Sequence, residues 1–412
     1  MQDAVTAKVC LITVGIGDIL SFPRMYKVAQ TLRRRGYRVV ALCVKRQDGP
    51  SVEVRNGILI KRVKPMMRTK RKLPQLFLLK RIGLYLSMIL AALKERADVY
   101  HCFHFGALPV GAVVKVLRGR SVKLFYDGIE DYSYAYAHYY MMTLGLPSLA
   151  RLVWKIYYKI ELFLVRRFVD FVFTVDSADG IPYKRYKSVS KNVMIIQNVP
   201  EIKTGDIDEE LKEKLTIKYK GYKLLVYVGA VHRIRGCLNM IKAMKFVREE
   251  IPNAKLLLIG DITDATFMNE ALTLIENYSL ENYVEFVGFV PYYELPTYLS
   301  ICEAGLWLYL PYLQSLRTKG SSKLFLYMQS GLPVIASDFP GIRAIVEESG
   351  CGLLVKPTDV KQIANAIIKL LNNPELAHKL GENGRKAVLE KYNWNIEEKK
   401  ILKVYENLSR AV

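Results

Sequence analysis

The residues best suited to bind an anion lie close together between positions 317 and 323. They are, in order, Arg317, Lys319, Gly320, Ser321, Ser322 and Lys323. Either serine can cap a helix that continues to Met328 and ends at Gly331. Free backbone N–H groups at a helix start and fixed positive charges together favour a bound phosphate. The spacing therefore predicts a phosphate site, although an ordinary solvated basic loop has the same composition.

The helix and the strand after it carry a family resemblance. Residues 323–337 read KLFLYMQSGLPVIAS, and this run resembles the C-terminal-domain signature of retaining glycosyltransferases of family 4. The resemblance implies an α/β chain with the GT-B fold, in which two Rossmann-like domains hold a nucleotide-diphosphate sugar in the cleft between them. It implies that Ser321, Ser322 and Lys323 contact this donor. The family's ribose-binding glutamate falls at Leu326.

The chain is long enough for two domains, since 412 residues exceed what one hydrophobic core usually organises. We expect an N-terminal acceptor domain over residues 1–200 and a C-terminal nucleotide-sugar-binding domain over residues 201–390. By the resemblance, a last helix over residues 391–412 crosses back to the first domain. Hydrophobic residues make up 51% of the chain and charged residues 24%, which excludes an intrinsically disordered protein.

The six cysteines are scattered, with no C-x-x-C pair and no histidine at metal-ligand spacing. This pattern is typical of a reduced cytosolic chain and gives no sign of a metal site or a disulfide framework. Residues 1–8 lack the basic and then apolar order of a signal peptide. We therefore expect the protein in the cytoplasm.

Positive charge is concentrated in the first half of the sequence. Through Pro200 there are 34 lysines and arginines against 13 aspartates and glutamates, and after it there are 27 against 26. Such a basic region suits nucleic acid or an anionic membrane surface as a partner. Two stretches in it, residues 68–93 and 132–168, mix basic with apolar or aromatic residues at helical spacing.

Both stretches fit amphipathic helices that lie in a lipid headgroup layer. In the first stretch, the side chains that we expect to meet the lipid are Phe77, Leu78, Tyr85 and Met88. The longest uncharged run, Ile82–Leu93, is too short to cross a bilayer, which needs about 20 residues. Ordinary helices that cover a sheet would have the same spacing. Single-stranded nucleic acid could stack on the second stretch, but no RNA-binding motif accompanies it. We favour peripheral binding at the inner face of the cell membrane.

The first domain opens with an apolar strand over Lys8–Val14, a loop with Gly15 and Gly17, and a helix over Pro23–Arg35. Strand, glycine loop and helix form the first unit of a Rossmann-like domain, and the β, α, β alternation that follows predicts a parallel sheet. A full G-x-G-x-x-G is absent, so no nicotinamide site is expected. Gly15 and Gly17 either let the backbone approach a ligand in the cleft or only form a tight turn.

Two later strands of this domain, DVYHCFH from residue 98 and KLFYDGIEDY from residue 123, end where open α/β sheets place ligand groups. They resemble the family runs DVVHAHD and YDAHELY. His101, Asp127 and Glu130 match these runs, and we assign catalytic roles to Asp127 and Glu130 on this resemblance. His104 stands at a family aspartate, and Ile129 stands at a family histidine.

The second domain begins with a strand over Lys223–Val228 and a turn at Gly229. In the family, a cation after this turn grips the donor diphosphate, and Arg235 holds that place. A guanidinium suits two phosphate oxygens, and a strand-to-helix turn adds N–H donors. His232 in the turn is either a cap or a ligand. Further positions expected to line the donor site are Gly260, Val287 and Gly288.

The resemblance implies a retaining transferase that moves a sugar from a UDP- or GDP-linked donor to a lipid-linked or cell-surface glycan. Arg235 and Lys323 would stabilise the leaving diphosphate, and a donor phosphate oxygen would take the acceptor proton. We expect no cofactor and no metal, because no pair of carboxylates suited to Mg²⁺ is evident. The replacements at Leu326 and Ile129 also fit a non-catalytic GT-B subunit that binds a partner transferase or a lipid glycan. The sequence predicts no particular oligomeric state.

Overall fold

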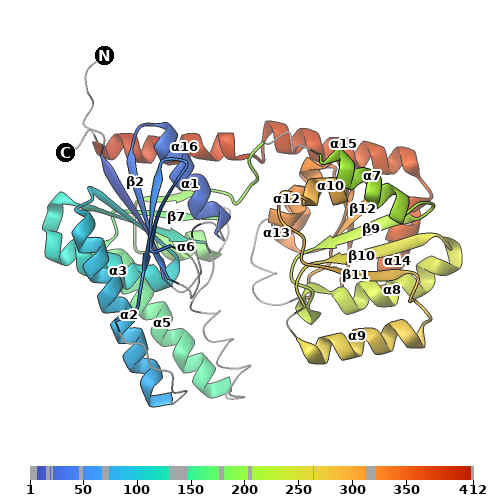
Figure 1. The fold of residues 1–412 in the computed structure, drawn as a ribbon, viewed down its shortest axis with the longest axis horizontal. Helices are drawn as coiled ribbons and strands as arrows, with labels where there is room; N and C mark the ends of the chain where they lie inside the picture. Colours follow the sequence, from blue (N-terminus) through green and yellow to red (C-terminus); the bar gives the residue numbers. More distant parts are fainter. Residues whose placement is uncertain are drawn as a thin grey trace. The chain divides into compact units, whose positions relative to one another are not determined.

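The structure, a computed structural model, describes residues 7–14, 19, 22–45, 50–66, 74–129, 133, 147–175, 181–202, 207–262, 264–311 and 322–409. The chain forms two compact domains, Met1–Gln197 with Glu397–Val412, and Asn198–Ile396 (Figure 1). The expected boundary at residue 200 lies close to this division. Residues 391–412 are shared: helix α16 (Trp394–Ser409) begins in the second domain and belongs to the first from Glu397 onward.

The first domain contains a sheet whose eight described strands have the order β3-β4-β2-β1-β5-β6-β7-β8. All neighbouring pairs are parallel except β3 and β4. The strands are β1 (Lys8–Thr13), β2 (Arg38–Val44), β3 (Val52–Arg55), β4 (Ile58–Val63), β5 (Val99–Phe103), β6 (Lys123–Gly128), β7 (Phe171–Thr174) and β8 (Val193–Ile195). The parallel sheet predicted from the alternation of strands and helices is confirmed.

Helices cover both faces of this sheet (Figure 1). They are α1 (Pro23–Arg34), α2 (Pro74–Glu95), α3 (His104–Arg118), α5 (Pro147–Phe168), α6 (Ile181–Lys187) and most of α16. Successive strand side chains point to opposite faces. Cys10 and Ile12 pack with α2, α3 and α5 in one apolar core. On the other face, His101 and Phe125 both contact Tyr405 of α16.

Strand β3 is an element that the sequence analysis did not predict. It pairs with β4 in an antiparallel hairpin, and the turn residues Asn56 and Gly57 have φ values of 51° and 73°. Asn-Gly is the preferred dipeptide for a tight hairpin turn, because both residues tolerate positive φ. The signal was therefore present in the sequence.

Helix α2 lies in the first stretch predicted to be amphipathic, but the side chains that it buries against the sheet are ones that we expected to face lipid. Met88 is fully buried, and Tyr85 packs against the core of the domain. The prediction that these two residues face lipid is wrong, because they lie on the side of α2 that covers the sheet. From Arg81 onward, where the side chains of α2 are described, the exposed large apolar residues are Ile82, Leu86 and Leu90. The side chains of Phe77 and Leu78 lie outside the described residues.

The second domain contains a sheet whose six described strands are all parallel, in the order β11-β10-β9-β12-β13-β14. The strands are β9 (Lys223–Val228), β10 (Ala254–Ile259), β11 (Val284–Gly288), β12 (Ala304–Trp307), β13 (Val334–Ser337) and β14 (Gly352–Val355). Their cores are runs of buried apolar residues, as expected for strands covered on both faces.

One face of this sheet packs against α8 (Cys237–Glu250), α9 (Ala265–Asn277) and α14 (Val360–Leu371). The other face packs against α7 (Glu209–Lys218), α10 (Leu295–Leu299), α12 (Ser322–Gln329), α13 (Pro340–Ser349) and α15 (Pro374–Glu390). Each domain is thus a sheet between two helical layers, which is the Rossmann-like architecture that the sequence predicts. None of the helices in the described part of the chain is long and apolar enough to span a bilayer.

Candidate functional site

The strand order of the second domain reverses beside β9. The chain passes from β9 through β10 to β11 on one side and then returns to β12 on the other side of β9. Crevices at the carboxyl ends of strands beside such a reversal are the usual ligand sites of open parallel sheets. The segments that follow β9 and β12 therefore form the candidate site in this domain.

Two glycines bring backbone segments close together at this edge. Gly229 follows β9 with a φ of 138°, and Gly260 follows β10 with a φ of 144°. A Cβ on Gly260 would overlap the carbonyl oxygen of Gly229, and a Cβ on Gly229 would overlap the end of the Lys323 side chain. Both positions therefore favour glycine, and Lys323 lies directly against the first turn.

Arg235 ends the short 3₁₀ helix η3 (Arg233–Arg235) that follows this turn. His232 caps η3, because its Nδ1 accepts a hydrogen bond from the backbone N–H of Ile234 at 3.3 Å. Of the two roles considered for His232, the structure shows the cap. The Arg235 guanidinium lies 4.2 Å from the centre of the Tyr309 ring, just after β12. Such stacking holds a guanidinium in place and leaves its edge to other partners.

Lys323 is the second cation at this edge and lies in the first turn of α12. Burial, and to a smaller extent the charge of Arg235, lowers the pKa of Lys323 from 10.5 to about 8. An anion bound near both cations would favour the charged lysine and reverse this shift. The structure thus brings together the two cations that the sequence assigned to the diphosphate.

Contacts between α12 and the sheet set the position of its first turn. The Tyr327 ring lies on Gly305, and its hydroxyl accepts a hydrogen bond from the backbone N–H of Val228 at 2.8 Å. Leu326 is 7% exposed and belongs to the apolar cluster between α12 and the sheet. Its side chain packs inside the second domain, and a contact with a donor ribose stays a prediction. Ser322 is the first residue of α12.

The end of β11 is the third predicted part of the donor site. Gly288 has a φ of 83°, and its carbonyl accepts a hydrogen bond from the Gly260 N–H at 2.8 Å. Val287 packs against the apolar cluster that includes Leu326. The following residue, Phe289, is 70% exposed. These backbone positions lie at the carboxyl edge of the sheet with Gly229, and their contact with a nucleotide stays a prediction.

The strand order of the first domain reverses between β1 and β5. Thr13 ends β1 and His104 follows β5 directly, and Thr13 Oγ1 lies 3.0 Å from His104 Nε2. His104 has a positive φ of 54°. Burial lowers the pKa of His104 to about 4, so its imidazole is neutral at pH 7.

Asp127, at the end of β6, is buried and binds Arg24 of α1 through both carboxylate oxygens. Arg24 Nε lies 2.8 Å from Oδ2, and Nη2 lies 3.0 Å from Oδ1. Arg24 also donates to the carbonyl of Ile196 at 2.7 Å. The pair therefore joins α1 to the sheet, and the catalytic role predicted for Asp127 stays a prediction.

His101 lies beside this ion pair and is also buried. Its Nε2 is 4.0 Å from Asp127 Oδ2, and its Nδ1 is 2.8 Å from the Tyr405 hydroxyl. Burial, with a contribution from Arg24, lowers the pKa of His101 well below its ordinary value. The sequence analysis missed Arg24, Tyr405 and Tyr309. No local pattern could have found the first two, because 103 positions separate Arg24 from Asp127 and 304 separate His101 from Tyr405.

Several residues assigned to the site lie outside the described part of the chain. They are Gly15, Gly17, Glu130, Arg317, Lys319, Gly320 and Ser321. Within the described part, no group of three or more histidine, cysteine, aspartate or glutamate side chains is placed to hold a metal ion.

The sequence of the second domain matches a known family. Residues 208–387 match the model of glycosyl transferases group 1. An uncharacterised glycosyltransferase of Methanocaldococcus jannaschii is 26% identical over 212 residues, which are 51% of this chain and 50% of that protein. EpsD of Bacillus subtilis, named as a glycosyltransferase, is 25% identical over 308 residues, which are 71% of this chain and 72% of that protein. The chain thus spans only half the length of the first of these relatives.

Solved structures share the fold over nearly the whole chain. Sucrose-phosphate synthase from Thermosynechococcus elongatus has a TM-score of 0.77 at 21% identity and covers 98% of this chain and 100% of its own. HepE from Anabaena, in complex with UDP and glucose, has a TM-score of 0.74 at 16% identity. The match covers 97% of this chain and 99% of the HepE chain. The chain has the GT-B glycosyltransferase fold. The predicted GT-B fold is therefore confirmed. The match of its second domain to group 1 supports the predicted class of enzyme, a transferase.

Proposed function

We propose that this GT-B protein transfers a sugar from a nucleotide-diphosphate donor to a lipid-linked or cell-surface glycan, with retention of the anomeric configuration. The observation that carries the proposal is the pair formed by Arg235 and Lys323 where the strand order of the second domain reverses. Two cations held in place by the Tyr309 ring and the Gly229 turn suit a diphosphate. The complex of HepE with UDP and glucose supports a UDP-linked donor, with GDP as the alternative.

In this proposal, the bond between the anomeric carbon and the diphosphate oxygen breaks, and the oxygen keeps the bonding electrons. Arg235 and Lys323 stabilise the charge that develops on the diphosphate. The acceptor oxygen bonds to the same face of the sugar, and its proton passes to a donor phosphate oxygen. Asp127 is not needed as a base in this scheme, and both of its oxygens already bind Arg24.

The acceptor and the location belong to the same proposal. A basic first domain and the family resemblance support a lipid-linked or surface glycan, which would be modified at the inner face of the cell membrane.

Replacement of Arg235 tests the diphosphate site. Arg235→Ala should weaken binding of UDP or GDP by about 1.5 to 3 kcal/mol, because a hydrogen bond to a charged group is lost. Calorimetry with both nucleotides measures this loss, and slow hydrolysis of a panel of nucleotide sugars then identifies the donor. Arg233→Ala is the matched control, since Arg233 lies in the same short helix but pairs with Glu270. Equal affinities for the two variants and the parent would remove Arg235 from the site.

A second candidate function is a non-catalytic GT-B subunit that binds a partner transferase or a lipid glycan. It is favoured by Leu326, which packs in an apolar cluster where the family has a ribose-binding glutamate. A folded protein that neither binds nor hydrolyses any nucleotide sugar of the panel would support this second function over the first.

A further inference from the structure

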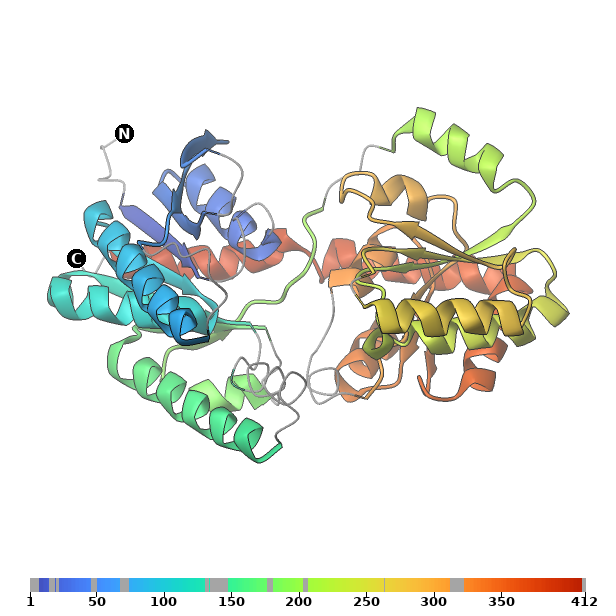
Figure 2. The ribbon, with the colours of Figure 1, turned by 60° about the horizontal axis from the view of Figure 1, so that its bottom comes forward.

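Three helices of the first domain present large apolar side chains to solvent. Helices α2, α3 and α5 cover the same face of the sheet, and α3 packs against both of the others. Figure 1 shows α2 and α5 extending past the ends of the strands, and the turned view in Figure 2 again shows α5 running clear of the sheet. Soluble monomeric proteins rarely expose large contiguous apolar patches, so this layer indicates a partner.

The clearest apolar row lies on α5. Its members are Leu152, Ile156, Ile160 and Phe163, which are 42 to 61% exposed. Spacings of four, four and three residues place these side chains on one side of a helix. Helix α2 has a row of the same kind at Ile82, Leu86 and Leu90, each nearly half exposed. Helix α3 adds two exposed valines and one exposed leucine in its last turns, Val113, Val116 and Leu117.

Cations lie beside the apolar row of α5. Arg151, Lys155 and Lys159 are exposed and precede the first three members of that row by one residue each. They form a second row, turned from the first by about 100° around the helix axis. Lysines and arginines at this position can reach the phosphates of a surface into which the apolar row inserts.

The three helices have no exposed acidic side chain. Their sequences contain two glutamates, Glu95 in α2 and Glu161 in α5, and both are buried. Glu161 accepts hydrogen bonds from the Tyr126 and Tyr186 hydroxyls at 2.6 and 2.7 Å and pairs with Arg185. The exposed charge of this layer is therefore entirely positive over the described residues.

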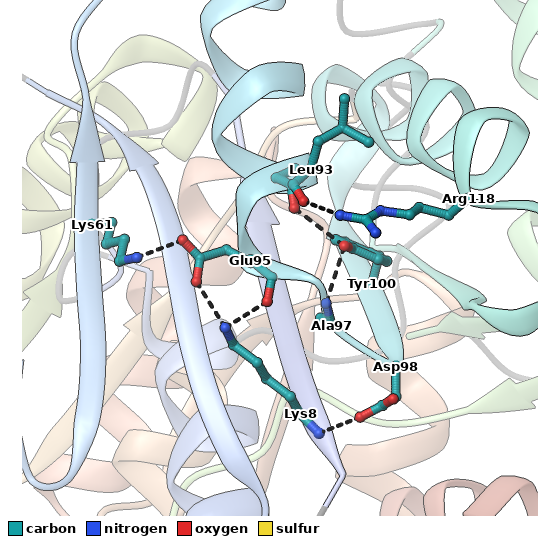
Figure 3. Close-up of polar contacts among 9 residues, drawn as sticks. Lys8, Lys61, Leu93, Glu95, Ala97, Asp98, Tyr100 and Arg118 are labelled. Carbon is teal, nitrogen blue, oxygen red and sulfur yellow. Dashed lines mark hydrogen bonds and ion pairs between the residues drawn. The ribbon is translucent and has the colours of Figure 1, made fainter.

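Polar contacts that are partly or fully buried hold both outer helices on the sheet. Figure 3 shows Glu95, at the end of α2, between Lys8 and Lys61, whose Nζ atoms lie 3.1 and 2.6 Å from its carboxylate oxygens. In the same view, Arg118 of α3 donates to the carbonyl of Leu93. The Glu161 contacts tie α5 to β6 and α6 in the same way. The outward orientation of the two apolar rows is therefore a fixed feature of the fold.

We propose that the outer surface of α2, α3 and α5 docks on an anionic lipid bilayer. The apolar rows enter the boundary between headgroups and acyl chains, and the cations beside them contact lipid phosphates. A second copy of this chain is disfavoured, because two such surfaces would bring positive charges together. The proposal assigns a surface to the membrane location proposed above, and it does not depend on sugar transfer.

Sedimentation of the full-length protein with vesicles tests the surface. The parent should bind phosphatidylcholine vesicles that contain phosphatidylglycerol, bind pure phosphatidylcholine much less, and be released by salt. Lys155→Gln with Lys159→Gln should weaken binding about 25-fold, at about fivefold for each cation. Ile156→Gln with Ile160→Gln should weaken it on the order of tenfold or more.

Matched controls lie on the second domain. Leu272→Gln removes a side chain as exposed as Ile156, and Arg385→Gln with Lys386→Gln removes two exposed cations. Neither control should change vesicle binding. If the parent does not bind anionic vesicles, or if the controls weaken binding as much as the α5 variants, the proposal is overturned.

Quenching of tryptophan fluorescence by brominated lipid distinguishes insertion of the apolar row into the bilayer from electrostatic attraction to its surface. Ile156→Trp should be quenched by brominated acyl chains in anionic vesicles, and Leu272→Trp should be quenched no more than the parent. Self-association or binding to single-stranded RNA that the α5 variants abolish, without vesicle binding, would assign the surface to another partner. Hydrolysis of nucleotide sugars, measured without vesicles, should be the same in the α5 variants as in the parent. A parent that binds anionic vesicles but hydrolyses no nucleotide sugar would therefore count against the transferase and not against the docking surface.

Discussion

Lys323 is expected to make donor binding depend on pH. Burial beside Arg235 lowers its pKa to about 8, whereas a bound diphosphate would keep it protonated. Affinity should therefore fall as pH rises through 8, and at pH 8 binding should take up about half a proton. Calorimetry in buffers of different ionisation enthalpy measures this uptake. Lys323→Arg is the control, since a guanidinium stays protonated and should abolish the uptake while keeping the charge.

The same pKa has a consequence for stability. Between pH 8 and 10.5 the unfolded chain still holds the Lys323 proton that the folded chain has released. The contribution of Lys323 to the free energy of unfolding therefore rises with pH in this window and is constant below it. For donor binding, proton uptake that is as large in Lys323→Arg as in the parent would show that a group other than Lys323 titrates.

Leu326 is expected to act through packing. Leu326→Glu would place a carboxylate in an apolar cluster, where the present side chain is 7% exposed. The variant should lose about 1 to 3 kcal/mol of stability in the second domain, and its donor binding should not improve. Thermal unfolding and nucleotide calorimetry measure the two effects, with Leu326→Met as the volume-conserving control. Tighter donor binding with an unchanged melting temperature would instead show that the side chain reaches the ribose.

A buried ion pair between Arg24 and Asp127 links helix α1 to β6. Asp127→Asn would leave Arg24 buried without a countercharge, and the first domain should lose about 3 to 5 kcal/mol of stability. Arg24→Met with Asp127→Leu should cost less, because no charge remains buried. Hydrogen exchange in β5 and β6 measures these changes within the first domain.

The exposed pair of Arg343 and Asp338 provides the control for this experiment. Asp338→Asn should leave exchange in the first domain unchanged and alter the second domain little, because water already solvates that carboxylate. A double variant at Arg24 and Asp127 that is less stable than Asp127→Asn would contradict the explanation from buried charge.

At the scale of the whole molecule, α16 makes the first domain discontinuous in sequence. Ile401, Leu402, Val404 and Tyr405 are buried in that domain. Truncation after Ile396 removes all four, and their burial stabilises the fold by more than the few kcal/mol that one domain can lose. The truncated chain should show loss of exchange protection in β1 and β5 and retained protection in β9 and β10.

Tyr405→Phe is the mild counterpart of this truncation. It keeps the buried ring and removes the hydroxyl that lies 2.8 Å from His101 Nδ1. It should cost about 0.5 to 1.5 kcal/mol, with both domains folded. Unchanged protection of the first domain after truncation would mean that residues 7–197 fold without α16.

The sequence determined the elements and their order. The run Val39–Val44, for example, is apolar throughout and lies between the charged residues Arg38 and Lys45, and β2 (Arg38–Val44) covers this run. A strand that is buried on both faces must be apolar along its whole length, so its ends can be read locally. The two cations of the donor site were also found locally, because glycine turns and helix starts next to basic residues are short patterns.

Only the tertiary structure decided which side of each helix is buried and which groups pair. In α2 the apolar residues continue around the helix, so sequence alone placed Tyr85 and Met88 on the wrong side. Asp127 pairs with Arg24, and Arg235 stacks on the Tyr309 ring, because the order of the strands in each sheet brings these distant residues together. A buried polar group needs a hydrogen-bond partner, but this need does not determine where along the chain the partner lies. The path of the folded chain determines which residue becomes that partner.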